Sequence, residues 1–267
     1  MSAMPIDRTV KPWGEPLSIP ANPDLTGGRR IGVLLSHGFT GEPSSMTPWA
    51  RALAEKGYGV EVPRLPGHGT SWQDMNTTTW DDWYGEVSRV FDKLCLENDA
   101  VVVGGLSMGG ALTIRLAEEH NDKISGLIVV NPAIASGNPQ LKLVPVLKHF
   151  VGGMKAIGSD IKKPGAVEKA YTRTPLKALH QMVKAWPAIV LDLPKITVPV
   201  LYLRSVDDHV VDGLSEKAFF AGVKSTDITF TKLTESYHVA TLDNDAQQII
   251  DDSAAFIARV TEAVTPA

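Results

Sequence analysis

The chain has 267 residues, of which 43% are hydrophobic and 21% are charged, a composition typical of a globular protein with a large core. Its formal net charge of −4 gives no basic surplus, which argues against a nucleic acid as a partner. The single cysteine, Cys95, excludes a disulfide within the chain, and no cysteine cluster suggests a metal.

Short apolar runs alternate with longer amphipathic segments along most of the chain. In chain order we expect strand 31–35, helix 46–56, strand 59–62, helix 80–96, strand 100–103, helix 110–120, strand 127–130, strand 200–203, helix 215–221, strand 228–233 and helix 246–260. Continuous apolar strands separated by helices are typical of a parallel sheet that helices cover on both faces. The sequence therefore predicts the α/β class, with a mostly parallel, doubly wound sheet.

The alternation stops between residues 132 and 194. This segment has several prolines and glycines, short apolar stretches and no convincing strand, so we expect a mostly helical insertion. Insertions just beyond the carboxyl ends of parallel strands lie where open α/β sheets bind ligands. The predicted organisation is a core of residues 1–131 and 195–267 with a small helical cap over 132–194.

The strongest chemical signal is the pentapeptide GLSMG at residues 105–109. G-x-S-x-G is a common pattern by itself, but here an apolar strand leads in and a helical pattern leads out, as a nucleophile elbow requires. A serine at such a sharp turn needs an unfavourable backbone conformation, and the flanking glycines remove side chains that would collide with neighbouring elements. The sequence therefore predicts Ser107 as the nucleophile of an acyl transfer.

Two polar turns follow later strands and fit the chain order serine, acid, histidine. The penultimate predicted strand runs into Asp207 and Asp208, and the last one runs into His238. Because these groups reach the same edge of the sheet, we predict His238 as the base that accepts the serine proton. One aspartate should orient this histidine, and spacing alone leaves Asp207 and Asp208 nearly even. His209 adjoins the acid but follows the wrong strand for the base.

The tetrahedral intermediate of an acyl transfer also needs hydrogen-bond donors for its oxyanion. In this arrangement they are the backbone N–H after the nucleophile and one N–H from the loop after an earlier strand. They correspond to Met108 and to Phe39, which lies in the sequence SHGFTG. The glycines of that loop allow the backbone to turn an N–H inward. We interpret His37 and His68 as residues that fix loops.

The motifs LLSHGFTGEPSSM, PRLPGHGT, GLSMGG, IGSDIKKP, DDHVV and SYHVATLD occur in this order along the chain. With these motifs and their spacing, the chain resembles the bacterial monoacylglycerol lipases and the related thermostable carboxylesterases. The resemblance runs from about residue 31 to the last helix and is far more specific than the nucleophile motif. It implies an α/β-hydrolase fold with a small helical cap and the cofactor-free hydrolysis of glycerol monoesters of fatty acids.

The resemblance also implies roles for single residues. It assigns the same nucleophile, base and oxyanion donors as the motifs do. Its acid is the aspartate directly before HVV, which favours Asp208 over Asp207. The region IGSDIKKPGAVEKAY resembles the part of the cap that contacts the monoglyceride, which implies Ile157 and Glu168 as substrate-binding residues. Glu168 would then bind the glycerol hydroxyls; the alternative is a solvent-facing helix carboxylate.

The leading hypothesis is a serine hydrolase that cleaves monoacylglycerols to glycerol and free fatty acid through an acyl-enzyme. The alternatives are a broad carboxylesterase for short acyl chains and, in another class, a non-hydrolytic ligand receptor on the same fold. The expected partner is a lipid ester, with transient membrane-surface contact through the cap and without nucleic acid, metal, cofactor or an obligate protein partner. The sequence shows neither a secretory signal nor an apolar run of membrane-spanning length, so we expect a cytoplasmic protein.

Overall fold

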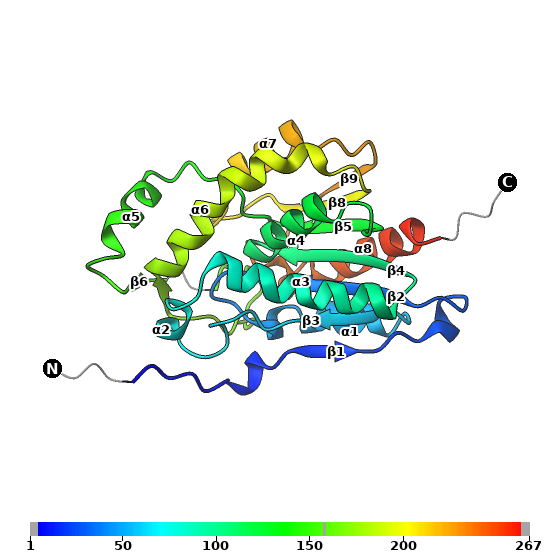
Figure 1. Cartoon of the computed structure of the whole chain (residues 1–267), viewed down its shortest axis with the longest axis horizontal. Helices are drawn as coiled ribbons and strands as arrows, with labels where there is room; N and C mark the ends of the chain where they lie inside the picture. The colour runs from blue at the N-terminus through cyan, green and yellow to red at the C-terminus, as the bar shows by residue number, and fades with distance from the viewer. Residues whose placement is uncertain (1–4, 157–158, 263–267) are drawn as a thin grey trace.

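A computed structural model describes residues 5–156 and 159–262 of the protein. Its centre is a seven-stranded sheet with the order β1 (Leu17–Ile19), β3 (Gly59–Val62), β2 (Ile31–Ser36), β4 (Ala100–Leu106), β5 (Gly126–Val130), β8 (Val200–Ser205) and β9 (Ile228–Leu233). Neighbouring strands run parallel except at the edge, where β1 pairs antiparallel with β3 (Figure 1). The predicted α/β class with a mostly parallel sheet is confirmed.

Helices cover both faces of the sheet. One face is covered by α1 (Thr47–Ala54) and α8 (Ala246–Val260). The opposite face is covered by α3 (Trp80–Glu97), α4 (Met108–Glu119), α6 (Leu176–Asp192) and α7 (Gly213–Gly222). Val33 and Leu35 pack into the first layer and Leu34 into the second, because successive side chains of a strand point to opposite faces. Each fully buried side chain of this kind stabilises the fold by about 1.5–3 kcal/mol.

The predicted core elements are all present, and their ends differ from prediction by a few residues. β4 and β8 continue beyond their predicted ends, to Leu106 and Ser205, which brings both strands up to the polar turns. The sequence pattern predicts neither β1 nor the one-turn helix α2 (Trp72–Met75), because each is too short to show a periodicity. Short 3-10 helices complete the core: η1 (Pro12–Gly14), η2 (Pro23–Leu25), η3 (Pro43–Ser45), η5 (Leu193–Lys195) and η6 (Ala240–Leu242).

Between β5 and β8 the chain leaves the sheet. Before α6, this stretch forms η4 (Pro139–Leu143), α5 (Val144–Leu147), β6 (Gly153–Lys155) and β7 (Arg173–Pro175). β6 and β7 pair antiparallel as a two-stranded ribbon, so the expectation that this stretch contains no strand is wrong. Three residues per strand are too few for an alternating pattern to be read from the sequence. In Figure 1, α5 and β6 lie at the left end of the molecule.

α6 connects this stretch to the rest of the protein. Its buried residues, among them Ala178 and Ile189, belong to the same apolar cluster as Val129 and Tyr202 of the sheet. Leu179 of the same helix lines the larger cavity described below. One helix therefore packs on the sheet and also lines a cavity. Within the part of the chain that the structure describes, no helix is long and apolar enough to cross a membrane.

Candidate active site

Ser107 lies at the turn between β4 and α4. Its backbone has φ 56° and ψ −117°, which a residue with a side chain rarely adopts. The Ser107 N–H donates to the Val130 carbonyl at 3.0 Å. A Cβ at Gly105 would lie 2.3 Å from the Gly109 carbonyl carbon, and one at Gly109 would lie 2.0 Å from the Ser36 carbonyl oxygen. The turn is strained, and only glycine fits two residues before the serine and two residues after it.

Asp208 and His238 form a buried hydrogen-bonded pair. The His238 Nδ1 and Asp208 Oδ2 atoms are 3.0 Å apart, and the Asp208 side chain is fully buried. The other carboxylate oxygen, Oδ1, accepts from the backbone N–H groups of Val210 and Val211, each at 2.9 Å. Asp207 is exposed. Of the two aspartates that the spacing could not separate, Asp208 is therefore the one bonded to the imidazole.

The surroundings of Asp208 keep its carboxylate ionised. Burial by itself raises the pKa of this group, but the hydrogen bond from His238, the Val211 N–H and the charge of Arg204 together lower the pKa to about 2. The Arg204 guanidinium donates from Nη1 to Asp208 and from Nη2 to the Val211 carbonyl at 2.6 Å. An ionised partner is what a catalytic imidazole needs, because it stabilises the imidazolium that forms during the reaction.

Ser107 and His238 line the same cavity, which has a volume of about 520 Å³. Much of its wall is apolar and comes from the stretch between β5 and β8. The apolar wall residues from that stretch include Leu141, Leu143, Val144, Leu147, Met154, Leu176, Leu179, Met182 and Trp186. A concave, mostly apolar site of this size with a few polar groups is typical of a pocket for a small apolar molecule.

The loop after β2 passes close to the serine. A Cβ at Gly38 would lie 3.4 Å from the Ser107 Cβ. Phe39 lines the cavity, and its ring packs edge-on against Trp83 with 6.3 Å between the centroids. Met108 is the first residue of α4, so its N–H is one of those at a helix start that have no acceptor within the helix. Met108 therefore directly follows the serine, and Phe39 directly follows the glycine that approaches it.

His37 stabilises this loop. Its Nδ1 lies 3.1 Å from the Gly38 carbonyl oxygen, to which it donates, and its Nε2 accepts from the Leu65 N–H at 3.3 Å. Burial lowers the pKa of His37 to about 4, so the ring is neutral near pH 7 and keeps both bonds. His68 packs against His37 with 5.0 Å between the ring centroids. This packing agrees with the interpretation of both residues as loop-fixing.

Comparison with known proteins gives the family. A family model described as serine aminopeptidase, S33, matches residues 28–245. A thermostable monoacylglycerol lipase of Bacillus sp. (strain H-257) is 41% identical over 244 residues, which are 90% of this chain and 95% of that protein. The chain belongs to this serine hydrolase family. The resemblance carried by the sequence motifs is confirmed.

Two further relatives match over most of the chain. A solved structure from work on the metagenome-derived lipolytic enzymes LipS and LipT has a TM-score of 0.88 at 37% identity, covering 94% of this chain and 100% of that one. A carboxylesterase of Bacillus subtilis (strain 168) is 25% identical over 229 residues, which are 85% of this chain and 92% of that protein. The relatives of this chain therefore include both lipases and an esterase.

In this serine hydrolase, Glu168 also lines the cavity. A Cβ at Gly41 would lie 2.7 Å from its Oε1 atom, so the carboxyl group packs against the loop after β2. Burial raises the pKa of Glu168 to about 7, while the neighbouring His238 acts in the opposite direction. The residue lies outside any helix, so it is not the solvent-facing helix carboxylate of the alternative interpretation. Ile157, the other predicted substrate-binding residue, lies outside the described residues.

Sequence reasoning missed the residues that connect these turns. Asn131 is fully buried with φ 47°, and its Nδ2 donates to the His238 carbonyl and to Ser205 Oγ, each at 2.9 Å. A polar residue directly after the apolar strand LIVV is a signal that could have found it. Asp160 accepts from the His238 N–H at 3.1 Å. In the sequence it is the aspartate of the motif IGSDIKKP, and it ends a run, 123–159, without any aspartate or glutamate.

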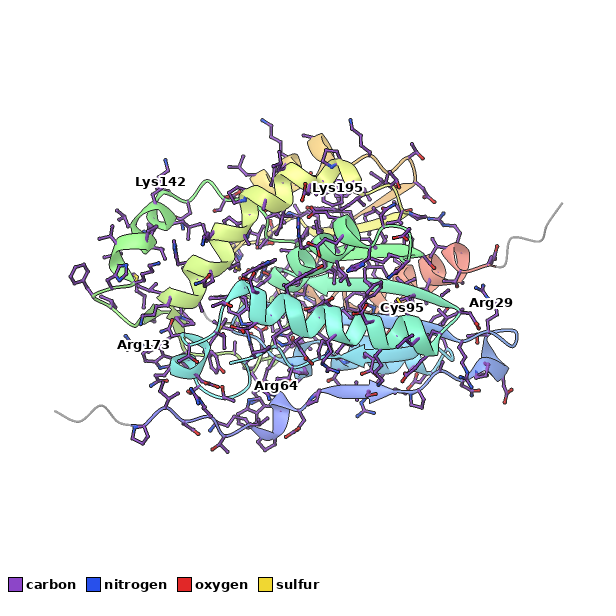
Figure 2. All side chains as sticks on the ribbon, in the orientation of Figure 1. Arg29, Arg64, Cys95, Lys142, Arg173 and Lys195 are labelled. Carbon is purple, nitrogen blue, oxygen red and sulfur yellow. The ribbon has the colours of Figure 1, made fainter. Side chains whose placement is uncertain are left out.

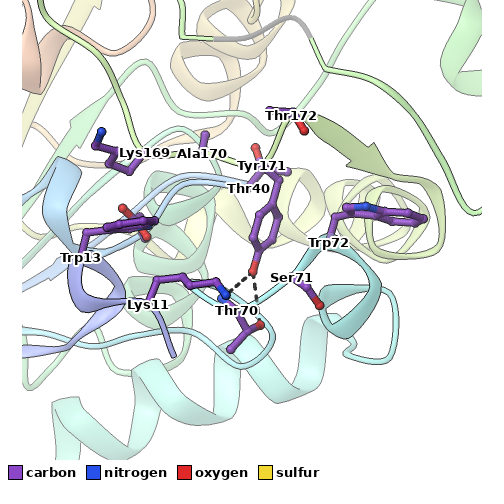
Figure 3. A pocket seen from close by; sticks show the side chains of 12 residues that line it. Lys11, Trp13, Thr40, Thr70, Ser71, Trp72, Lys169, Ala170, Tyr171 and Thr172 are labelled. Atoms are coloured by element: carbon purple, nitrogen blue, oxygen red, sulfur yellow. Dashed lines mark hydrogen bonds between the residues drawn. The ribbon is translucent and has the colours of Figure 1, made fainter. Parts of the chain in front are cut away.

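A second cavity, of about 240 Å³, shares part of its wall with the first. Thr40, Ala170 and Tyr171 line both. Figure 3 shows the Tyr171 hydroxyl beside Thr70, whose backbone N–H donates to it at 2.9 Å. Glu42 lines this second cavity, and burial raises its pKa to about 7. Among the described residues, no group of three or more histidine, cysteine or acidic side chains is arranged to hold a metal ion.

Proposed function

We propose that this protein hydrolyses monoacylglycerols to glycerol and free fatty acid through an acyl-enzyme on Ser107. One observation carries the proposal: Ser107 and the Asp208-bonded His238 line a single cavity of about 520 Å³ whose wall is largely apolar. Such a cavity suits an acyl chain, with the reacting groups at one place on its wall. The 41% identity to a protein named as a monoacylglycerol lipase supports this substrate class.

In the proposed acylation, Asp208 accepts from Nδ1–H of His238 and thereby leaves Nε2 free to take the Ser107 hydroxyl proton. The serine Oγ bonds to the ester carbonyl carbon, and the carbonyl electron pair moves onto its oxygen. When the C–O bond to glycerol breaks, His238 returns the proton to the glycerol oxygen. Water then attacks the acyl-enzyme by the same route, which releases the fatty acid and restores Ser107.

The backbone N–H groups of Phe39 and Met108 are the proposed donors to the oxyanion. Removing one such donor typically costs on the order of 3 kcal/mol of transition-state stabilisation. Because both donors belong to the main chain, substitution of either side chain leaves the N–H in place. Such a substitution tests packing around the loop after β2 rather than the hydrogen bond.

The two ends of the substrate would meet different surfaces. We assign the glycerol hydroxyls to Glu168, whose carboxyl group packs beside the loop that follows β2. Ile157 stays a predicted contact of the same end, from the motif alone. The acyl chain would lie along the apolar wall formed by residues between β5 and β8. This division explains why one cavity holds carboxylates as well as many methyl groups.

We further propose that residues 132–194 act as a cap on a hydrolase core of residues 1–131 and 195–267. Two observations support this division: the stretch adds no strand to the seven-stranded sheet, and it supplies most of the apolar wall of the cavity. The apolar packing of α6 on the sheet, from Ala178 near its start to Ile189, argues that this helix is held firmly. Selectivity for the acyl chain would then depend on α5 and the ribbon.

We also propose that the same stretch makes transient contact with a lipid surface. Leu143, Val146 and Phe150 expose 57%, 61% and 82% of their surface. Residues 123–159 contain no aspartate or glutamate, whereas Lys142 and Arg173 lie at the same end of the molecule (Figure 2). Exposed apolar side chains with cations beside them are typical of peripheral attachment to anionic lipid.

A substrate panel tests the proposed chemistry. Purified protein is given 1-monolauroylglycerol, a dilauroylglycerol and p-nitrophenyl esters of short acids, and kcat/KM is measured for each. We expect the monoacylglycerol to be preferred over the diacylglycerol. If the short aryl esters exceed it by orders of magnitude, the protein is a short-chain carboxylesterase instead.

Covalent labelling separates a hydrolase from a non-hydrolytic receptor on the same fold. A fluorophosphonate reacts only with a serine that a base activates. We expect one label per chain at Ser107, found by peptide mass spectrometry, and none in Ser107→Ala. A wild-type protein that stays unlabelled would rule out the proposed activity.

A further inference from the structure

Asp160 connects the two turns that carry the proposed acid and base. Its Oδ2 atom accepts from the backbone N–H of His238 at 3.1 Å and from the backbone N–H of His209 at 3.2 Å. His209 directly follows Asp208, so one carboxylate oxygen bonds to both turns. We propose that Asp160 is a positioning residue that keeps the His238 imidazole aligned with Asp208 and Ser107; the inference rests on the proposed function.

On the base turn, Asp160 bonds to two consecutive residues. Its side chain accepts from His238, and its backbone carbonyl accepts from the Val239 N–H at 3.0 Å. The His238 carbonyl in turn accepts from Asn131 Nδ2 at 2.9 Å. Both backbone polar groups of His238 are thus bonded to side chains from other parts of the fold. These bonds restrict rotation of the peptide planes from which the imidazole projects.

On the acid turn, His209 makes a second bond to the same carboxylate. Its Nδ1 lies 2.9 Å from Asp160 Oδ1, and its ring packs edge-on against Tyr237 with 4.6 Å between the centroids. The hydrogen bond with Asp160 raises the pKa of His209. His209 therefore links the turn after Asp208 to the residue before His238, and it is bonded to Asp160 rather than to the acid of the pair.

Asp160 is itself held in place by its neighbours along the chain. Asp243, which is almost fully buried, accepts from the backbone N–H groups of Lys162 at 2.7 Å and Lys163 at 2.8 Å. The same Asp243 carboxylate accepts from the Tyr237 N–H at 2.9 Å. Two carboxylates thus attach the 160–163 segment to the turn that carries the base: Asp160 bonds to His238 itself and Asp243 to Tyr237, the residue before it.

The contacts explain why the role is positioning rather than proton transfer. The Asp160 carboxylate bonds to the backbone N–H of His238 and not to its ring, whereas Asp208 bonds to the ring itself. A displacement of about 1 Å in a catalytic group can cost about a hundredfold in rate. Asn131 and Asp208 still bond to His238 when Asp160 is removed. We therefore expect the imidazole to move by less than about 1 Å and the rate to fall by less than about a hundredfold.

The test compares Asp160→Ala with Asp160→Asn, which keeps an acceptor oxygen for the two backbone N–H groups. Exhaustive fluorophosphonate labelling gives the concentration of active sites, and kcat is calculated per labelled site. Misfolded protein, which is not labelled, then does not lower the measured kcat. With p-nitrophenyl butyrate, we expect Asp160→Ala to lower kcat per labelled site about tenfold with little change in KM, and Asp160→Asn to recover to within about threefold of wild type. Asp207→Ala, an exposed carboxylate in the acid turn, is the matched control and should match wild type.

A second readout does not require turnover. The proton between His238 Nδ1 and Asp208 should give a far-downfield ¹H resonance in the resting protein, and we expect it to shift or broaden in Asp160→Ala but not in Asp160→Asn. An unchanged resonance together with an unchanged kcat per labelled site in Asp160→Ala would overturn the inference, as would equal losses in the alanine and asparagine variants. Failure of the proposed function gives a different result, because the wild-type protein then shows no fluorophosphonate labelling or no turnover. The downfield resonance still shows in that case whether Asp160 positions the His238 imidazole.

Discussion

The turns that carry Ser107, Asp208 and His238 and the segment 139–151 around α5 line one cavity but are held in different ways. The Asp208 side chain is fully buried, and its two oxygens receive hydrogen bonds from the imidazole, the guanidinium and two backbone N–H groups. In the other region, Val146 and Phe150 expose more than half of their surface. One region is defined by directional polar contacts and the other by apolar surface.

This difference predicts how each region responds to change. A hydrogen bond to a charged group contributes about 1.5–3 kcal/mol, and a buried charge left without its partner costs more. Apolar contacts are non-directional, and their effect scales with the area removed from water. Substitutions at the turns should therefore change kcat by orders of magnitude. Substitutions in the apolar region should change binding by small factors and leave the chemistry intact.

The largest effect is expected at Ser107. Ser107→Ala removes the atom that bonds to the acyl carbon, so kcat for p-nitrophenyl butyrate should fall by about six decades, as it does when a comparable nucleophile is removed from a serine protease. Binding of a fluorescent monoacylglycerol analogue should persist, because the cavity wall is unchanged. Residual turnover within two decades of wild type would show that another residue is the nucleophile.

The next effect is expected at Asp208. Asp208→Asn offers an amide N–H where a carboxylate oxygen accepts from His238 Nδ1–H, which favours the wrong tautomer of the ring. The corresponding change in a serine protease lowers kcat by about four decades, and we expect a loss of that order here. Steady-state kinetics of Asp208→Asn and Asp207→Asn form a matched pair. If Asp207→Asn does the greater damage, the acid is assigned to the wrong carboxylate.

The same contrast explains what the sequence could predict. Buried strands such as β4 form continuous apolar runs, and the turn after each one carries a polar residue type that local chemistry identifies, as at Ser107. Asp207 and Asp208 are neighbours with the same chemistry, and only the packed turn shows that Asp208 accepts from the imidazole. Asp160 accepts from His238 across 78 residues of sequence, so the motif IGSDIKKP by itself does not show which residue Asp160 bonds to.

A smaller, pH-dependent effect is expected at Glu168. Its pKa of about 7 means that the carboxylate, the better acceptor for glycerol hydroxyls, forms as pH rises through 7. KM for 1-monolauroylglycerol should therefore fall between pH 6 and pH 8 in wild type and stay flat in Glu168→Gln, with a difference of up to about tenfold at pH 8. p-Nitrophenyl butyrate has no glycerol and is the control. If the ratio of the wild-type KM to the Glu168→Gln KM for the monoacylglycerol does not change with pH, Glu168 does not bind the glycerol hydroxyls.

The raised pKa also gives a prediction on stability. The folded state disfavours the ionised carboxyl group of Glu168. The contribution of Glu168 to the free energy of unfolding therefore falls as pH rises from 4.5, the pKa of the group in the unfolded chain, through about 7, its pKa in the folded protein. Glu168→Gln cannot ionise and should lose this dependence. The melting temperature of the variant should therefore exceed that of wild type at pH 8 and approach it at pH 5.

The smallest effect is expected on the exposed apolar surface of the stretch between β5 and β8. A phenylalanine ring that inserts partly into a lipid surface gains only a fraction of the 1.5–3 kcal/mol available on full burial, so Phe150→Ser should weaken binding to anionic vesicles about threefold. Leu96→Ser is the matched control, because Leu96 is 88% exposed on α3 and Phe150 is 82% exposed. Vesicle sedimentation measures the binding, and turnover of dissolved p-nitrophenyl butyrate should be the same in all three proteins. Equal losses of vesicle binding in both variants would mean that the lipid contact does not depend on this stretch, and the division between a polar catalytic region and an apolar lipid-facing one would have to be redrawn.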